Sequence, residues 1–214
     1  VLYVVETGDT IQSVADLKGK TIYTTGKGTT PEYSLNYVLT QNGIDPASDV
    51  TIEFKSEAAE VAAALAEGTA QIAMLPEPFV TTAMAKNENL RVALNLSEEW
   101  DKVSSDGSGM VTGVLIFSRD FLEQNPQAAS QFLEEYKASV AYVNENTEDA
   151  AALVEKFGVA PAAVAQKALP NCSITFLEGD AMKERVGGYL SVLFQQNPQS
   201  VGGNLPDDAF YFAR

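Results

Sequence analysis

The chain has 214 residues, of which 29 are acidic and 14 are basic, so its net charge at neutral pH is −15. Such a surface disfavours nucleic acids and anionic membranes as partners, because both are bound mainly through Lys and Arg. The sequence contains no His and one Cys, which excludes Ser-His-Asp and Cys-His catalytic groups, His-ligated metal sites and an intrachain disulfide.

The first half of the chain alternates short apolar runs with helical patterns. Strands are predicted at residues 2–6, 20–24, 50–55, 70–75 and 90–96. Helices are predicted between them at residues 13–19, 30–43, 56–68 and 76–86. The second of these helices is expected to begin with Thr30 as its N-cap and Pro31 at the first helical position. This alternation favours an α/β fold with a mainly parallel, doubly wound sheet.

The second half of the chain is nearly all helical. Residues 104–113 are rich in glycine and typical of a linker, and residues 114–118 are predicted to form one more strand. Helices are predicted at residues 125–146, 147–158, 160–169 and 178–197, and the first and last of them carry clear apolar stripes. We therefore predict an α/β lobe at residues 1–115 and a helical segment at residues 116–214.

The apolar stripes of the helical segment need a surface against which they can be buried. A second sheet would be the natural cover, and the sequence predicts no further strands after residue 118. The chain also opens directly on the predicted strand at residues 2–6. We therefore expect that an N-terminal segment is absent from this chain, and that the stripes pair with that segment or with another chain.

The first candidate site is the stretch TTGKGTT, which follows the predicted strand at residues 20–24. In a phosphate-binding P-loop Lys directly precedes Ser or Thr, and this spacing is not met, so nucleotide binding is disfavoured. The glycines would still let the backbone approach a ligand, and the next helix would present free N–H groups. The predicted ligand contacts are Thr25, Gly26, Lys27, Gly28, Thr29 and Thr30. The alternative is an ordinary turn between a strand and a helix.

The second candidate site is the corner MLPEPF, where Pro76 and Glu77 follow the predicted strand at residues 70–75. Ligands of open α/β sheets bind at the carboxyl ends of strands, which places this corner beside the first candidate. Glu77 would accept hydrogen bonds from a ligand. The alternative is a carboxylate that is favoured at a helix N-terminus, and we expect that role for Glu32.

Three more residues complete the sequence predictions. Thr112 is expected either to face the ligand, on a linker whose glycines permit a bend, or to lie on a flexible surface loop. Trp100 is expected to pack a short helix against the sheet rather than to stack on a ligand. Cys172 is expected to be a small buried apolar residue. The sequence predicts no catalytic residue, metal ligand or cofactor site.

Three stretches together resemble a known family. They are the turn DLKGKTI, the stretch GTAQIAMLPEP, and the helix beginning NPQAASQFLEEY. They are similar to the extracytoplasmic solute-binding proteins of ABC importers, in the group that binds nitrate, sulfonates, taurine and thiamine precursors. The resemblance covers nearly the whole chain and implies a type II periplasmic-binding-protein fold. In that fold, residues 1–115 correspond to a complete second lobe, and the later helices cover a first lobe whose opening sheet is absent here.

The resemblance implies a protein that closes around a small solute and delivers it to the membrane subunits of an ABC permease. It implies an extracytoplasmic location, in the periplasm or as a lipid-anchored protein, without catalysis. One alternative is the ligand-sensing domain of a transcription regulator with the same lobe fold. A second is an enzyme of the thiamine-pyrimidine synthase type, which the absence of His disfavours. The charge of the solute stays open, because Lys27 favours an anion whereas Glu77 favours a cation or a base.

Overall fold

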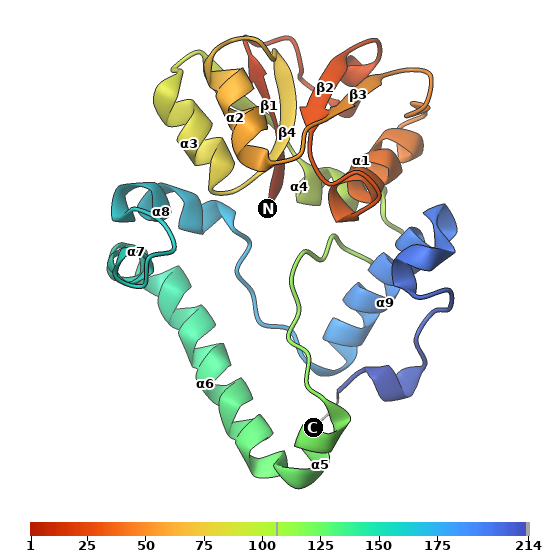
Figure 1. The fold of residues 1–214 in the computed structure, drawn as a ribbon. Helices are drawn as coiled ribbons and strands as arrows, with labels where there is room; N and C mark the ends of the chain where they lie inside the picture. The colour runs from red at the N-terminus through yellow and green to blue at the C-terminus, as the bar shows by residue number, and fades with distance from the viewer. Residues whose placement is uncertain (106, 213–214) are drawn as a thin grey trace.

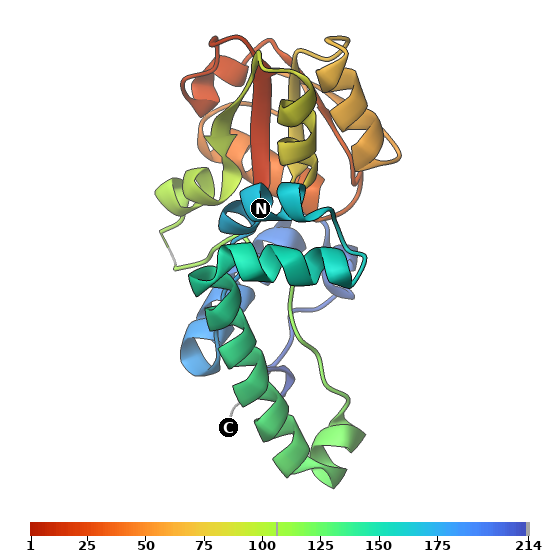
Figure 2. The same cartoon turned by 90° about the vertical axis from the view of Figure 1, so that its left-hand side faces the viewer.

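The computed structural model describes residues 1–105 and 107–212. Figure 1 shows a sheet with its helices at one end of the molecule, and the helices of the second half arranged below it. In Figure 2, α6 projects away from the sheet, while α7 and α8 lie between α6 and the sheet. Within the described residues, no helix combines the length and the apolar character that crossing a membrane requires.

The sheet has five strands among the described residues, in the order β3-β2-β4-β1-β5. Their bounds are β1 Leu2–Thr7, β2 Thr21–Thr24, β3 Thr51–Phe54, β4 Ile72–Pro76 and β5 Leu90–Asn95. β2 is parallel to both β3 and β4, whereas β1 is antiparallel to both β4 and β5. The α/β fold class is confirmed, and the sheet is mixed because its inner strand β1 runs against its neighbours.

Helices flank the sheet and fill the second half of the chain. In the first half they are η1 Val14–Leu17, α1 Thr30–Gln41, α2 Ala58–Ala66, α3 Phe79–Lys86 and α4 Leu96–Val103. In the second half the α-helices are α5 Arg119–Gln124, α6 Pro126–Glu145, α7 Thr147–Lys156, α8 Ala162–Ala168 and α9 Gly179–Gln196. Short 3-10 turns occupy η2 Leu169–Asn171, η3 Pro198–Val201 and η4 Asp208–Phe210. We call residues 1–103, the sheet with α1–α4, the α/β layer.

The side chains of β1 are apolar on both faces of the sheet, and helices cover both faces. Leu2 and Val4 point into one core, which they share with residues of α1, α4 and α9. Tyr3 and Val5 point into the other core, which α2 and α3 complete. Because successive side chains of a strand face opposite sides, an apolar run such as Leu2–Val5 is stable only with helices on both faces.

Trp100 is fully buried at the centre of the first core. Its ring lies 4.1 Å from the ring of Tyr37 on α1 and 5.4 Å from that of Tyr189 on α9, measured between centroids. Aromatic rings at these separations attract one another in addition to the area they bury. The prediction that Trp100 packs a short helix against the sheet is confirmed.

Three local predictions were wrong. Residues 114–118 are not a strand, because no strand of the described chain lies beside them to complete a ladder. The N-cap of α1 is Thr29 rather than Thr30, since the backbone is already helical at Thr30. Cys172 is only partly buried, and its thiol donates to the carbonyl of Ala168 at 3.3 Å.

The second half exposes a group of large apolar side chains. Its exposed members include Val114, Leu115, Ile116, Phe121, Phe132 and Tyr136. The ring of Phe117 joins them, with its centroid 6.0 Å from that of Phe121 and 5.9 Å from that of Phe132. Ile116 is 83% exposed, which is unusual for an apolar side chain of this size. We refer to this set as the apolar face.

An ion pair between the buried Glu6 and the partly exposed Arg91 holds the loop after β1 in place. Glu6 is only 1% exposed, and its carboxylate accepts hydrogen bonds from the amides of Thr10 at 3.1 Å and Ile11 at 3.0 Å. The guanidinium of Arg91 donates to the same carboxylate and to the carbonyl of Ile11. Burial by itself would raise the pKa of Glu6, but the bonds from Ile11 and Thr10 and the charge of Arg91 outweigh it and lower that pKa.

We predict that Glu6→Gln lowers the free energy of unfolding by about 2–3 kcal/mol at pH 7, because the neutral side chain no longer pairs with Arg91 and its NH2 group replaces one of the two buried oxygens that accept from Thr10 and Ile11. The folded-state pKa of Glu6 is lowered, so its stabilisation is complete above the unfolded-state pKa and is lost as the pH falls through the folded-state pKa. Urea unfolding of both proteins at pH 7 and pH 3 should therefore show a difference that shrinks in acid.

The matched control is Glu53→Gln, on the exposed edge strand β3, which should change the unfolding free energy by less than about 0.5 kcal/mol at either pH. A difference between Glu6→Gln and the parent that stays constant from pH 7 to pH 3 would contradict the proposed role of the ionised carboxylate.

Candidate functional site

The candidate site lies at one edge of the sheet. Because β2, β3 and β4 are parallel, the loops that follow them emerge at the same edge and lead into α1, α2 and α3. In Figure 1 this edge faces the helices of the second half of the chain. The structure therefore brings the two candidate stretches, after β2 and after β4, onto neighbouring strands of one edge, as expected from the sequence.

The loop between β2 and α1 is a tight turn held by its own residues. The hydroxyl of Thr29 donates to the carbonyl of Gly26 at 2.6 Å, and the amide of Thr29 donates to the same oxygen at 3.0 Å. Gly26 has a φ of +76°, and a Cβ added there would lie 2.8 Å from the ring of Pro31. Glycine is therefore required at this position for both conformation and space.

Glu32 acts as a first-turn carboxylate, as expected. It lies in the first turn of α1, and its side chain accepts a hydrogen bond from the amide of Gly28. Glu60 does the same in α2, where it accepts from the amide of Ser56 at 3.2 Å. These bonds use loop amides that would otherwise be free to bind a ligand, and they place negative charge beside two helix N-termini.

The remaining residues of the first stretch point in different directions. Lys27, Gly28 and Thr29 are exposed, and the ammonium group of Lys27 lies 5.8 Å from the ring centroid of Phe54 on β3. Thr30 instead contacts α9, because its hydroxyl hydrogen-bonds with that of Tyr189. Burial raises the pKa of Tyr189, and the hydrogen bonds with Ser34 and Thr30 partly oppose that effect.

Glu77 is engaged at the start of α3. Its carboxylate accepts from both the amide and the hydroxyl of Thr81, each at 3.1 Å, and its own amide donates to the carbonyl of Val1 at 3.2 Å. The peptide bond between Glu77 and Pro78 is cis. This geometry is that of a carboxylate bound at a helix N-terminus, and both carboxylate oxygens already have a partner.

Thr112 lies exposed on the segment that connects the α/β layer to α5. Within the described part of the chain, no hydrogen bond joins its side chain to the loops at residues 25–30 or 76–78. The structure thus groups the first two candidate stretches and leaves Thr112 apart from them.

The sequence reasoning did not select the side chains beside the loops at the ends of β2 and β3. Tyr23 and Phe54 occupy these strand ends, and the ammonium group of Lys55 lies 5.7 Å from the ring centroid of Tyr23. Lys27 and Lys55 are therefore both held over aromatic rings at this edge, in the geometry of cation–π contacts. Tyr23, Phe54 and Lys55 lie among the last two residues of predicted strands, and that position was the signal that could have identified them.

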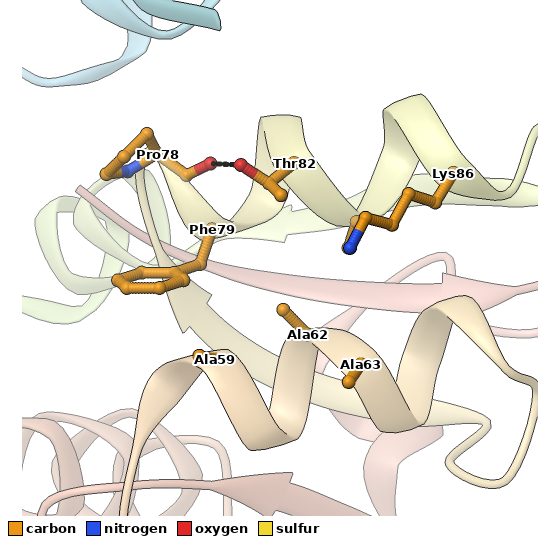
Figure 3. A pocket seen from close by; sticks show the side chains of 8 residues that line it. Ala59, Ala62, Ala63, Pro78, Phe79, Thr82 and Lys86 are labelled. Carbon is orange, nitrogen blue, oxygen red and sulfur yellow. Dashed lines mark hydrogen bonds between the residues drawn. The ribbon is translucent and has the colours of Figure 1, made fainter. Parts of the chain in front are cut away.

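Figure 3 shows a small hollow between α2 and α3, away from the loops after β2. Its volume is about 140 Å³, and its lining includes Ala59, Ala62, Ala63, Phe79, Thr82 and Lys86. The hydroxyl of Thr82 already donates to the carbonyl of Pro78 at 2.9 Å. The lining therefore offers few free polar groups, and the hollow is a less suitable solute site than the sheet edge.

Several solved structures of transport proteins are similar to this one. An ABC transporter protein from Parabacteroides distasonis is 25% identical, has a TM-score of 0.76, and is matched over 100% of this chain and 70% of its own. The periplasmic aliphatic sulphonate binding protein of Escherichia coli is 20% identical, with a TM-score of 0.69, over 96% of this chain and 65% of its own. The chain thus spans about two thirds of the length of these relatives.

A third structure, the alkanesulfonate-binding protein of Xanthomonas axonopodis pv. citri bound to MOPS, is 19% identical with a TM-score of 0.62, over 96% of this chain and 66% of its own. A search of curated proteins found no match. The model of one family, described as a phosphonate periplasmic substrate-binding protein of ABC transporters, matches residues 1–107. The chain therefore belongs to this family of periplasmic substrate-binding proteins of ABC transporters.

Proposed function

We propose that this protein is the component of an ABC importer that captures a small solute outside the cytoplasm and delivers it to the permease subunits in the membrane. The observation that carries the proposal is the family match over residues 1–107, which includes all of the α/β layer and the sheet edge where the two candidate loops lie. Because the chain spans about two thirds of its relatives, capture and delivery are proposed for the full-length protein.

The proposed solute wall is the sheet edge formed by Thr25–Thr30, Pro76 and Glu77, with Thr112 on the connecting segment. Gly28 and Lys27 are exposed there, so a solute can approach the backbone and one cationic side chain without displacing packed residues. Thr30 and Glu77 are bound to α9 and to α3, which supports a role in holding the wall in place.

We propose that the group of the solute that meets this wall is anionic. Lys27 and Lys55 are the cations held at the edge, each over an aromatic ring. A flexible ammonium group suits an oxyanion as a point charge. The matching family is described as phosphonate-binding, and two similar structures are named for sulphonates, which are also oxyanions. The carboxylates of Glu32 and Glu60 lie beside the helix N-termini and weaken the attraction of those termini for an anion. We therefore assign most of the proposed recognition of the anionic group to Lys27.

The proposal predicts that an alkylsulphonate or alkylphosphonate binds the full-length protein and raises its midpoint of thermal unfolding. Lys27→Ala should weaken this binding by roughly 10- to 100-fold, because it removes a hydrogen bond between charged groups. Isothermal titration calorimetry with a panel of anionic, neutral and cationic solutes measures the affinities, and a thermal unfolding scan with the same panel measures the midpoint.

Lys86→Ala is the matched control, because Lys86 is an exposed lysine at the far end of α3 from the Pro76–Glu77 corner and should leave the affinity unchanged. A panel in which neutral or cationic solutes bind and anions do not would refute the proposed charge while retaining a solute-binding function. Binding of none of them would count against the function itself.

A separate prediction concerns Glu77. Glu77→Ala should lower the free energy of unfolding by about 1 kcal/mol, because the amide and the hydroxyl of Thr81 lose their acceptor at the start of α3. Glu57→Ala, which removes a charge at the N-cap of α2 but no capping hydrogen bond, should cost less. Urea unfolding measures the loss of unfolding free energy in each variant. Equal losses in the two variants would show that Glu77 contributes by its charge alone.

A further inference from the structure

The segment that leaves the α/β layer is packed tightly against α9. Ser108 is only 2% exposed, its hydroxyl accepts from the indole N–H of Trp100 at 3.3 Å, and it lies 2.9 Å from the hydroxyl of Ser104. Further along, Met110 and Val111 pack against the core that contains Trp100. Residues 108–111 are therefore part of the first core rather than a free linker.

A glycine on α9 makes this contact feasible. A Cβ added to Gly188 would lie 2.4 Å from the Cβ and 2.9 Å from the Cα of Ser108, so the two backbones touch at this point. The Cα belongs to the backbone and cannot rotate away, in contrast to the end of a flexible side chain. Gly109 faces the guanidinium of Arg185, which pairs with Asp101 at 3.0 Å across the same junction.

The C-terminal end of α9 also contacts the α/β layer. The side chain of Gln196 donates to the carbonyl of Tyr33 at 2.8 Å, and that of Asn197 donates to the hydroxyl of Tyr33 at 3.0 Å. Between these ends, the hydroxyl of Tyr189 lies 3.3 Å from that of Ser34 on α1. Along its C-terminal half, α9 is thus joined to the α/β layer by polar and apolar contacts.

The tight packing stops at Gly113. Thr112 and Gly113 are exposed, as are Val114 to Ile116, and a Cβ added to Gly113 would have no atom within 4 Å. Gly113 therefore needs glycine neither for a positive φ nor for a close approach. It is the first glycine after Trp100 at which an added Cβ would meet no neighbour, since Gly107 and Gly109 face Glu184 and Arg185.

We propose that α9 moves as one rigid unit with the α/β layer, and that the first connection to α5 and α6 bends at Gly113. This inference rests on the proposed function, because it concerns the motion by which the protein would close around its solute. It differs from the division predicted at residue 115, since it assigns α9 to the same moving unit as residues 1–111. The glycines at 107 and 109 then serve packing and turn geometry, not bending.

Spin-label distances test this assignment without any solute. In a Cys172→Ser background, cysteines are placed at exposed positions by Glu67→Cys on α2 and Gln195→Cys on α9, or by Glu67→Cys and Ser139→Cys on α6. Double electron–electron resonance should give a narrow distance distribution for the first pair and a broader one for the second. Equal widths for the two pairs would overturn the proposal.

Two glycine variants provide a second, independent measurement. Gly188→Ala should lower the thermal midpoint by roughly 3–10 °C, because the added methyl group overpacks against the backbone of Ser108. Gly113→Ala should leave the midpoint within about 2 °C of the parent, since nothing lies near it. The reverse order of the two shifts would refute the inference. Solute titration of the parent reports separately on the proposed function, so the two failures can be distinguished.

Discussion

The structure depends on the burial of Trp100. This one side chain contacts Tyr37 from the first half of the chain and Tyr189 from the second, and its indole N–H bonds Ser108 on the segment that connects them. Contacts between residues so far apart in sequence gain stability only when both parts of the chain are in place. The loop after β2 is positioned from the same core, because α1 begins directly after the turn at Gly26 and carries the ring of Tyr37.

The elements of the fold could be predicted from local pattern, but the way they are joined could not. The apolar run at Leu2–Val5 identified β1, yet an inner antiparallel strand and an inner parallel strand have the same composition when both faces are buried. The run at 114–118 has the composition of a strand, and it remains unpaired because a strand is completed by its neighbours rather than by its own residues.

For the candidate site, the sequence predicted where the loops lie but not where their side chains point. The position of the two loops could be predicted, since parallel strands place their carboxyl ends together and each loop precedes a helix. The direction of individual side chains could not, because it depends on distant partners. Thr30 contacts Tyr189, which lies far along the chain, and Glu77 is bound by Thr81, so neither is free as its spacing alone would indicate.

The apolar face has a consequence for how this chain behaves in water. Phe121, Phe132 and Ile116 expose hydrocarbon that favours association with any similar surface, while a net charge of −15 keeps separate copies apart. These two forces respond differently to electrolyte, because added ions shorten the range of the repulsion to about 10 Å at 0.1 M and leave the attraction between apolar groups in place. Raising the ionic strength therefore shifts the balance of these two forces toward contact between exposed apolar side chains, and lowering it shifts the balance toward repulsion.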